Sequence, residues 1–390
     1  MKLLVVSTFF ESHRGGLEIV AGTLARELKT RGLQVRWLAS SASPAPSDID
    51  AVPVRAWNVA EDRLGVPYPV FGLRALARVF REVRAADAVL IHDALYMSSI
   101  AALLAAKLLR RPVVVVQHIG EVPYWNPLLH GLMRLANRLV ARPMLRFADR
   151  TVFISETTHR HFAGIRFSAA PLLIMNGVDH DTFRPALTPA AQAEIRARLR
   201  LSPDRRLALF VGRFVEKKGL NLLREAARGR PDLDWVLAGW GPIDPASWAL
   251  PNVSVRSDLK GTSLAELYAA ADVFVIPSRG EGFPLVVQEA LACGLPVVCG
   301  AETASADEAA SPFLLGVETD GADALEALNT AVDRALEQTW TQRRQRADFA
   351  AKRYSWTAAA DRYLELIGQL AARSRRRTAP PLQAGAASSI

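Results

Sequence analysis

The feature that most restricts the fold of this chain is an alternation of short apolar runs with helical patterns, which occurs twice in succession. The first series lies within residues 1–180, and the second begins at residue 207. Short apolar runs separated by helical segments predict parallel strands joined by crossover helices. We therefore predict an α/β fold of two Rossmann-like, doubly wound parallel-sheet domains. The predicted strands are 3–7, 35–39, 88–91, 113–117, 151–155, 172–175, 207–212, 235–239, 253–255, 273–276 and 296–299.

The same alternation indicates where the domains meet. We place one domain at residues 1–180 and the other at 181–355, with the polar helical segment 189–200 as the connection. Doubly wound sheets bind ligands beyond the carboxyl ends of their strands, so we expect the domains to face each other across a ligand cleft. A helix is predicted over 356–373. The arginine-containing, Pro/Ala/Ser-rich residues 374–390 predict a disordered basic tail.

Composition excludes several classes of protein. Of the 390 residues, 50% are hydrophobic and 22% are charged, which is typical of a soluble globular chain. No apolar run reaches the roughly 18 residues that span a bilayer, and no signal-peptide cleavage pattern follows the first apolar run. We therefore expect a cytoplasmic protein. Cys293 and Cys299 are the only cysteines, and we interpret both as reduced core residues.

The positive charge of the chain is concentrated in its first half. The net charge is +9, and residues 1–180 contain 22 Lys and Arg against 14 Asp and Glu. This balance predicts an acidic partner, either anionic lipid head groups or a phosphate-bearing acceptor. Neither half contains G-x-G-x-x-G after a strand, which argues against a nicotinamide enzyme. We expect no nucleic-acid partner.

Two glutamates flank a predicted strand-to-helix turn in the second domain. Glu281 lies at the mouth of the predicted helix and Glu289 lies eight residues further on, which is a span of roughly 12 Å at most in a helix. A helix start also offers free backbone N–H groups and the positive end of its dipole to an anion. This spacing matches a sugar, a diphosphate and a ribose in a row. The residues expected to line the donor between the glutamates are Gly282, Phe283, Pro284 and Leu285.

Two cations are predicted near the same cleft. Arg213 follows the strand 207–212, and Lys218 opens the next helical pattern five residues later. A guanidinium fork together with an ammonium point charge suits a diphosphate that gains negative charge as it leaves. We interpret the neighbouring Lys217 as a solvated cation. The alternative is that all of these cations lie on the surface without a partner.

The first domain contains a glycine loop and three histidines near predicted strand ends. Gly15 and Gly16 precede a helical pattern over 17–31, where free N–H groups favour a phosphate, although glycine pairs also simply make turns. His118 follows the strand 113–117, which places an imidazole at the cleft edge. His13 in the glycine loop and His92 at the end of the strand 88–91 are candidates for the acceptor side.

Metal binding is not expected. The strings Asp48-Ile49-Asp50 and Asp232-Leu233-Asp234 have the D-x-D form that can hold a divalent cation. The first lies in a Ser/Pro-rich segment, and the second precedes a strand at its amino end, away from the predicted cleft. Arg213 and Lys218 would supply the charge neutralisation that a metal provides. We predict no cofactor apart from the donor substrate itself.

In this order and spacing, the motifs resemble the large retaining glycosyltransferase family 4, which has the GT-B architecture of two Rossmann-like domains. The resemblance covers almost the whole chain. It rests on Gly15-Gly16-Leu17-Glu18, Asn176-Gly177-Val178-Asp179, Val211-Gly212-Arg213, Lys218-Gly219-Leu220, Gly239-Trp240-Gly241-Pro242, the Glu281/Glu289 segment, Gly294-Leu295-Pro296-Val297-Val298 and Tyr354-Ser355-Trp356.

The resemblance implies a role for each candidate residue. Glu281 would bond sugar hydroxyls, Glu289 the nucleotide ribose, and Arg213 with Lys218 the diphosphate. The amide of Gly16 would contact the phosphates, and His118 would lie near the transferred sugar. The helix after Trp356 would cross back onto the first, acceptor-binding domain. Pro284 stands where the family often has glycine, and residues 256–259 lack an expected glycine, so the nucleotide base is left open.

The activity implied is transfer of a hexose from a nucleotide-diphosphate sugar to a lipid-linked or polysaccharide acceptor, in cell-envelope or exopolysaccharide biosynthesis. The anomeric configuration would be retained, with the leaving diphosphate taking the acceptor proton. Two alternatives are a nucleotide-sugar epimerase of the same fold and a catalytically silent scaffold in a polysaccharide assembly complex. Acceptor identity would be set by first-domain loops, where Tyr124 and Trp125 are candidates for stacking on a sugar.

A basic stripe raises the question of membrane contact. Arginines recur every four residues along the helical pattern 132–145, which predicts one positively charged side. The stripe is either a solvated face or a docking surface for anionic lipid on the inner face of the membrane. Its members are Arg134, Arg138, Arg142 and Arg146, with Arg74, Arg78 and Arg81 on a second amphipathic pattern.

Overall fold

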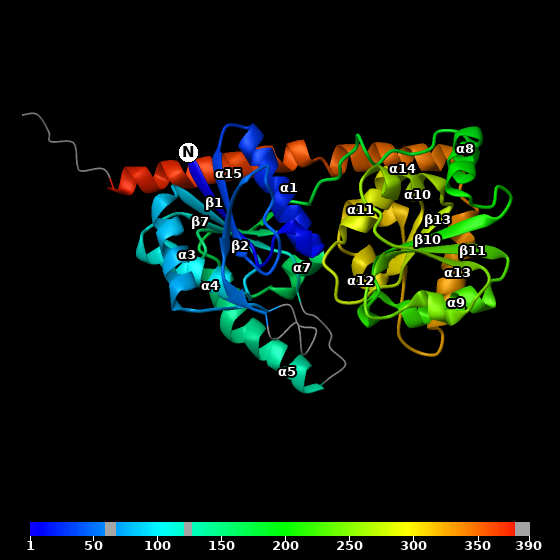
Figure 1. The fold of residues 1–390 in the computed structure, drawn as a ribbon, viewed down its shortest axis with the longest axis horizontal. Coiled ribbons are helices and arrows are strands. Elements are labelled where there is room, and N and C mark those ends of the chain that lie inside the picture. Colours follow the sequence, from blue (N-terminus) through cyan, green and yellow to red (C-terminus); the bar gives the residue numbers. More distant parts are fainter. Residues whose placement is uncertain (59–67, 121–126, 379–390) are drawn as a thin grey trace, which may run out of the picture. The chain divides into compact units, whose positions relative to one another are not determined.

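The computed structural model describes residues 1–58, 68–120 and 127–378 (Figure 1). By their internal contacts, the residues divide into two compact units. Unit 1 comprises residues 1–115, 147–150 and 360–390, and unit 2 comprises residues 116–146 and 151–359. Within the described ranges, no helix is both long and apolar enough to cross a membrane.

A seven-stranded sheet is formed by the first half of the chain, in the order β3-β2-β1-β6-β7-β8-β9. Strand β1 lies between β2 and β6 and pairs in parallel with both, with Leu3 opposite Val35 and Ala88. Six strands were predicted. Strand β3 was not, because its Pro53 and the Ser/Pro-rich residues before it hide the apolar pattern; proline is tolerated there because β3 is an edge strand. The bounds are β1 Lys2–Val6, β2 Gln34–Ser40, β3 Asp50–Val54, β6 Ala88–His92, β7 Val113–Gln117, β8 Arg150–Phe153 and β9 Leu172–Leu173.

The helices of this half follow the predicted amphipathic patterns. Helix α1 buries Val20, Leu24 and Leu28, which lie four residues apart on one face. A two-stranded hairpin of β4 and β5 was not predicted. The predicted helix over 132–145 is divided into three parts, because a π-helical turn, η2, interrupts it. The bounds are η1 Glu11–His13, α1 Gly16–Thr30, β4 Ala56–Trp57, β5 Val70–Phe71, α3 Leu73–Ala85, α4 Met97–Leu108, α5 Pro127–Ala136, η2 Asn137–Ala141, α6 Arg142–Phe147 and α7 Glu156–His161.

The second half of the chain forms a six-stranded sheet in the order β12-β11-β10-β13-β14-β15. All neighbouring strands are parallel. Strand β15 was not predicted, because it has only four residues and one of them is a glycine. The strand order reverses between β10 and β13, and such a switch point is where doubly wound sheets bind ligands. The bounds are β10 Arg206–Arg213, β11 Leu233–Trp240, β12 Val253–Arg256, β13 Val273–Ile276, β14 Val297–Gly300 and β15 Leu314–Val317.

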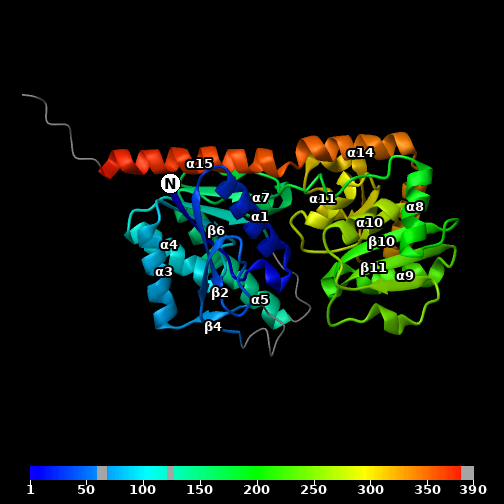
Figure 2. The ribbon, with the colours of Figure 1, turned by 45° about the horizontal axis from the view of Figure 1, so that its top comes forward.

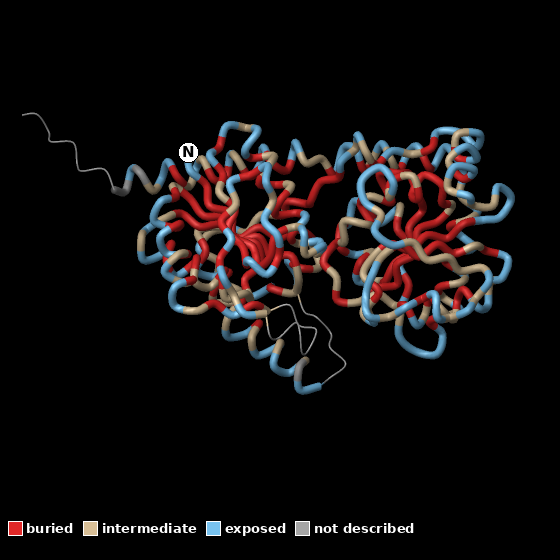
Figure 3. The backbone as a smooth tube through the Cα atoms, in the orientation of Figure 1, coloured by how far each residue is buried: buried red, intermediate tan, exposed pale blue. Residues whose placement is uncertain are grey.

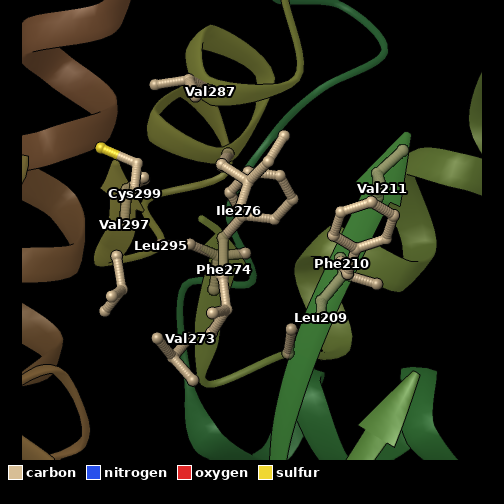
Figure 4. Close-up of a cluster of buried hydrophobic side chains, with 14 of the residues drawn as sticks. Leu209, Phe210, Val211, Val273, Phe274, Ile276, Val287, Leu295, Val297 and Cys299 are labelled. Atoms are coloured by element: carbon tan, nitrogen blue, oxygen red, sulfur yellow. The ribbon is translucent and has the colours of Figure 1, made fainter. Parts of the chain in front are cut away.

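Helices cover both faces of the six-stranded sheet. Figures 1 and 2 show α9 on one face and α10 with α11 on the other. The strands between them are buried (Figure 3). The whole of β13 is inaccessible to solvent, and it packs with residues of β10, α11 and β14 (Figure 4). The bounds are η3 Glu216–Lys218, α9 Leu220–Gly229, α10 Thr262–Ala270, α11 Leu285–Ala292, α12 Ala301–Ala304, α13 Ala324–Leu336 and α14 Trp340–Arg353.

This core explains the continuous apolar character of the predicted strands. Each fully buried Val, Leu, Ile or Phe contributes about 1.5–3 kcal/mol of transfer free energy, and β13 supplies four such residues. Cys293 and Cys299 are buried and free, which confirms the interpretation of both as reduced core residues.

Two helices near the predicted domain boundaries differ from their predictions. Helix α8 (Pro189–Leu199) was predicted as a connection, but it is docked within unit 2. Its Arg196 is 5% exposed, donates to the Ala270 carbonyl and pairs with Asp272 at 2.7 Å. A buried charge pair fixes such a helix in place because removing one partner strands the other. The final helix α15 (Trp356–Thr378) continues five residues beyond its predicted end at residue 373.

Candidate active site

The predicted diphosphate-binding cations lie at the switch point of the second sheet. Arg213 is the last residue of β10, and Lys218 ends the short turn η3 that follows. Gly219 then has φ +76°, and a Cβ there would lie 2.3 Å from the carbonyl oxygen of Pro277, directly after β13. Only glycine permits this approach, which brings the turn after β10 against the end of β13.

The carboxylate of Glu281 forms ion pairs with both lysines of this turn. Its Oε1 lies 3.1 Å from the Nζ of Lys218 and 3.2 Å from the Nζ of Lys217. The interpretation of Lys217 as a solvated cation is therefore wrong. The physical reason is the tight 3-10 turn, which places two consecutive long side chains within reach of one carboxylate.

The charges of this cluster shift one another's ionisation. Burial alone would raise the pKa of Glu281, but the ammonium groups of Lys217 and Lys218 outweigh it and hold the pKa below its ordinary value. Burial lowers the pKa of Lys218, and Glu281 only partly offsets that effect. Glu281 is consequently ionised at neutral pH. It can accept hydrogen bonds from hydroxyl groups, and the lysines leave the cluster with excess positive charge.

Arg213 is held by an aromatic ring. Its guanidinium carbon lies 4.9 Å from the ring centroid of Trp240, the last residue of β11. The backbone fixes this ring, because a Cβ at Gly239 would lie 1.9 Å from the carbonyl oxygen of Gly212 and Phe214 N–H donates to the Trp240 carbonyl. The Nε of Arg213 is buried and has no hydrogen-bond partner among the described residues. A stacked guanidinium with an unused donor is preorganised for an anionic ligand.

The turn between β13 and α11 is tied to its neighbours. Arg279 N–H donates to the Lys217 carbonyl at 2.9 Å, and Gly280 N–H donates to Glu302 Oε2 at 3.0 Å. Pro284 precedes α11 as its N-cap residue. The side chain of Phe283 is 2% exposed and belongs to the hydrophobic core. Phe283 can therefore meet a donor only through its backbone.

Glu289, the second predicted glutamate, lies in α11 and receives the hydroxyl of Tyr268 at 3.0 Å on Oε2. Burial raises the pKa of Glu289 to about 7, although this hydrogen bond lowers it in part. The carboxyl group is thus close to half protonated at neutral pH. It can accept from a ribose hydroxyl when ionised and donate to one when protonated.

His118 directly follows β7 and is 5% exposed. Burial lowers its pKa to about 3, so the imidazole is neutral at physiological pH. The segment around it lies against the turn that carries Glu281. A Cβ at Gly282 would lie 2.5 Å from the His118 carbonyl oxygen, and the Thr157 hydroxyl donates to the Gly282 carbonyl at 3.3 Å. Within unit 2, the backbone carbonyl of His118 therefore lies against Gly282, the residue that follows Glu281.

The other first-domain candidates lie at the switch point of the first sheet, between β1 and β6. Gly15 caps α1 and Gly16 begins it, and a Cβ at Gly16 would meet open space. His13 stacks on Phe9 with ring centroids 3.9 Å apart. The side chain of His92 is fully buried. Their roles toward a ligand stay predictions, and Tyr124 and Trp125 lie outside the described residues.

The four-arginine stripe needs correction at one member. Arg142 donates to the carbonyls of His161 and Ala163 at 3.1 and 3.3 Å, and its guanidinium lies over Phe162. Arg142 is therefore turned onto its own unit instead of presenting its charge as one of four equivalent surface cations. Sequence periodicity does not reveal these contacts, because the carbonyls that hold Arg142 lie at and after the end of α7, about twenty residues further along the chain.

The D-x-D carboxylates are engaged by arginines. Asp48 binds the guanidinium of Arg26, which also holds Glu11. The hydrogen bond to Arg26 lowers the pKa of Asp48, and burial opposes this shift only in part. Asp232 receives Arg230 at 2.9 Å and Asp234 receives Arg205 at 2.6 Å. Asp50 receives a hydrogen bond from Arg36 at 2.9 Å, so each of the four carboxylates has an arginine partner.

Three residues support the site in roles that were not predicted from the sequence, although one of them, Trp240, belongs to a quoted motif. They are Trp240 beneath Arg213, Tyr268 on Glu289 and Glu302 on the Gly280 amide. The isolation of Trp240 between two glycines is a usable signal, because such a residue is held by backbone contacts alone. Tyr268 and Glu302 carry no comparable signal, since each meets its partner only through tertiary packing.

Family models match both halves of the chain. The model described as Glycosyltransferase Family 4 matches residues 14–182, and the model described as Glycosyl transferases group 1 matches residues 191–354. The chain belongs to glycosyltransferase family 4. This confirms the resemblance inferred from the motifs.

One curated relative aligns over nearly the full chain. The D-inositol 3-phosphate glycosyltransferase of Xylanimonas cellulosilytica is 28% identical over 391 residues, covering 91% of this chain and 92% of the relative. Five other curated relatives, among them the sulfoquinovosyl transferase SQD2 of Arabidopsis thaliana, align over only 30 to 51% of their own length.

Solved structures confirm the GT-B fold of this family 4 member. Sucrose-phosphate synthase from Thermosynechococcus elongatus superposes with a TM-score of 0.76 at 21% identity, covering 96% of this chain and 100% of that one. HepE of Anabaena in complex with UDP-glucose superposes with a TM-score of 0.71 at 19% identity, covering 95% and 100%. At these identities the likeness concerns the fold alone.

Proposed function

We propose that this chain is a retaining hexosyltransferase that uses a nucleotide-diphosphate sugar. One observation carries the proposal, the convergence of Arg213, Lys217, Lys218 and Glu281 beyond the switch-point strands β10 and β13. Excess positive charge beside an ionised carboxylate suits a diphosphate linked to a hydroxyl-rich sugar. The acceptor is a lipid-linked or polysaccharide hydroxyl compound in cell-envelope or exopolysaccharide biosynthesis.

The residues have separate tasks in this reaction. The bond from the anomeric carbon to the diphosphate breaks while the bond to the acceptor oxygen forms on the same face. The acceptor proton moves to the departing phosphate oxygen. Arg213 and Lys218 offset the charge that develops there, so no metal is required. Glu281 orients the sugar hydroxyls, and the neutral His118 offers a hydrogen bond at the sugar without adding charge.

The nucleotide is held at the far end of α11 in this proposal. Glu289 bonds the ribose, while backbone N–H groups near Gly282 and Leu285 meet the sugar and phosphates. The Gly16 amide of the first domain stays a predicted phosphate contact. Two relatives fit a phosphate-bearing or lipid acceptor by name, because one is named for D-inositol 3-phosphate and another for a phosphatidylinositol monomannoside.

The test is a panel of nucleotide sugars, with released nucleotide and transferred sugar measured together. We expect one donor to release nucleotide, to tolerate EDTA and to lose turnover in Glu281→Ala. Glu216→Ala is the matched control, because Glu216 is an exposed glutamate in the adjacent turn η3. Isomerised sugar without nucleotide release would instead favour the epimerase. Binding of no donor at all would favour the scaffold.

We also propose that the protein works in the cytoplasm with peripheral contact to an anionic membrane. The support is a row of exposed leucines on α5 and η2, where Leu132, Leu135 and Leu139 are 58, 51 and 62% exposed and arginines follow in the sequence. An apolar row flanked by cations suits the boundary of anionic lipid. Replacing Leu132 and Leu139 by Gln should reduce co-sedimentation with anionic vesicles, whereas Leu104→Gln, an exposed leucine of α4, should not.

A further inference from the structure

A basic hollow lies in unit 2 beside the turn after β7. It is an open depression with a volume of about 640 Å³, within the range of small-molecule sites. Three arginines line it, and among the described residues none of the lining side chains is acidic. The residues used here are Arg134, Arg138, Arg142, Asn137, His161 and Leu135.

The π turn explains why three arginines share this hollow. In an α-helix, each step of four residues overshoots a full turn by about 40°, so the three would fan out around the axis. A π turn holds more residues than an α turn and takes back part of that drift. Because η2 contains Arg138 and directly precedes Arg142, it returns Arg142 toward the side of Arg134. The carbonyls of His161 and Ala163 then hold the Arg142 guanidinium in place.

The polar groups at the hollow include a hydrogen-bond acceptor as well as cationic donors. Asn137 is 7% exposed and donates to the Gly120 carbonyl at 3.0 Å. Its Oδ1 is buried and has no hydrogen-bond partner in the described part of the chain. Within the same part of the chain, Arg138 forms no ion pair or hydrogen bond either. The unpaired acceptor of Asn137 beside the guanidinium of Arg138 fits a ligand that carries both a hydroxyl group and a phosphate.

The position of the hollow points to the acceptor. Gly120 lies two residues after His118, whose carbonyl contacts the Gly282 position, and a Cβ at Gly120 would be 3.0 Å from the His161 ring. One short segment therefore contacts both the sugar-recognising turn and the hollow. Three guanidinium groups exceed the charge of a carboxylate and match a phosphate.

We propose that this hollow binds a phosphate group of the acceptor, held by Arg134, Arg138 and Arg142, with Asn137 receiving an adjacent hydroxyl group. That this ligand is the acceptor rests on the proposed glycosyl transfer, but the binding of phosphate itself can be measured without any donor. The phosphate belongs either to a soluble phosphorylated sugar or polyol, or to the head group of a lipid.

The first experiment titrates inorganic phosphate into the full chain at constant ionic strength, followed by calorimetry and thermal unfolding. The double variant Arg134→Gln/Arg138→Gln should weaken phosphate binding at least about tenfold, since each charge-assisted contact is worth a factor of that size. Arg146→Gln is the matched control, because Arg146 belongs to the same arginine series but does not line the hollow. Equal binding by the double variant and the native chain would overturn the proposal.

The second experiment identifies the source of the phosphate. Vesicles of phosphatidylcholine with phosphatidylglycerol are sedimented with each variant, with and without inorganic phosphate. Vesicle binding that is lost in the double variant and displaced by phosphate supports a lipid head group. Phosphate binding without such vesicle binding supports a soluble acceptor. If Arg146→Gln weakens vesicle binding as much as the double variant does, and phosphate does not displace the vesicles, then the protein binds lipid through a general basic surface. That outcome overturns the proposal of a phosphate site in the hollow.

A separate readout distinguishes the two proposals. Donor turnover into nucleotide is measured on the same preparations. If phosphate binds at the hollow but no nucleotide sugar is turned over, the glycosyl-transfer proposal fails while the phosphate site stands. If the double variant still releases nucleotide from the donor and binds phosphate as well as the native chain does, the glycosyl-transfer proposal stands and the proposed phosphate site is wrong.

Discussion

Glu289→Gln tests the electrostatics of the candidate site on the protein without any ligand. Burial raises the pKa of Glu289 from an ordinary value of 4.5 to about 7. Because the folded state binds this proton more tightly than the unfolded state, stability is full below pH 4.5 and is lost as pH rises to 7. At about 1.4 kcal/mol for each tenfold change in ionisation, the charged group costs about 3 kcal/mol at pH 8.

Glutamine removes that cost while keeping a carbonyl for the Tyr268 hydroxyl. Glu289→Gln should therefore be more stable than the native chain by up to about 3 kcal/mol at pH 8, by less than about 1 kcal/mol at pH 5, and by almost nothing at pH 4. The measurement is urea unfolding of both proteins across this range, compared as a difference at each pH. A two-unit protein need not unfold in one step, so the transition that shifts is the one compared.

Glu281→Gln is the matched control, with the opposite sign. The two lysines hold the pKa of Glu281 below its ordinary value, so its charge stabilises the fold above that value and the benefit disappears as pH falls. This variant should be less stable than the native chain at pH 8, and the loss should shrink on acidification. If the Glu289→Gln difference were independent of pH, the assignment of a buried, proton-retaining carboxyl group would be refuted.

Three further changes test the local geometry. Gly219→Ala should cost about 2 kcal/mol or more in urea unfolding, because of its φ of +76° and the Pro277 carbonyl 2.3 Å from the new Cβ; an unchanged midpoint would contradict this packing. Arg196→Ala should cost about 3 kcal/mol, because buried Asp272 would keep only the Leu207 N–H and the more distant Arg206, and a loss under about 1 kcal/mol would speak against a buried pair. Trp240→Ala should raise the donor KM more than Trp240→Phe, and equal effects would exclude stacking on Arg213.

Sequence reasoning succeeded where a residue is placed by its strand. Arg213 ends a strand that the apolar run 207–212 predicts, and its position at the sheet edge then follows from topology. It failed where side chains meet through turns that the pattern does not encode. The 3-10 turn that brings Lys217 to Glu281 and the π turn that redirects Arg142 both change direction by a fraction of a turn, which hydrophobic periodicity cannot resolve.

The backbone of the glutamate turn has fewer donors for a diphosphate than the sequence pattern indicates. The N–H group of Gly280 is used by Glu302, and Pro284 has none. The first turn of α11 still offers the N–H groups of Leu285 and Val286, whereas that of Val287 donates to the Pro284 carbonyl, and a single helix end supplies only a partial charge. Side-chain cations must therefore carry most of the neutralisation. Donor binding should weaken steeply with added salt, and Lys218→Ala should remove much of that salt dependence; a salt-independent donor Kd would contradict this division of labour.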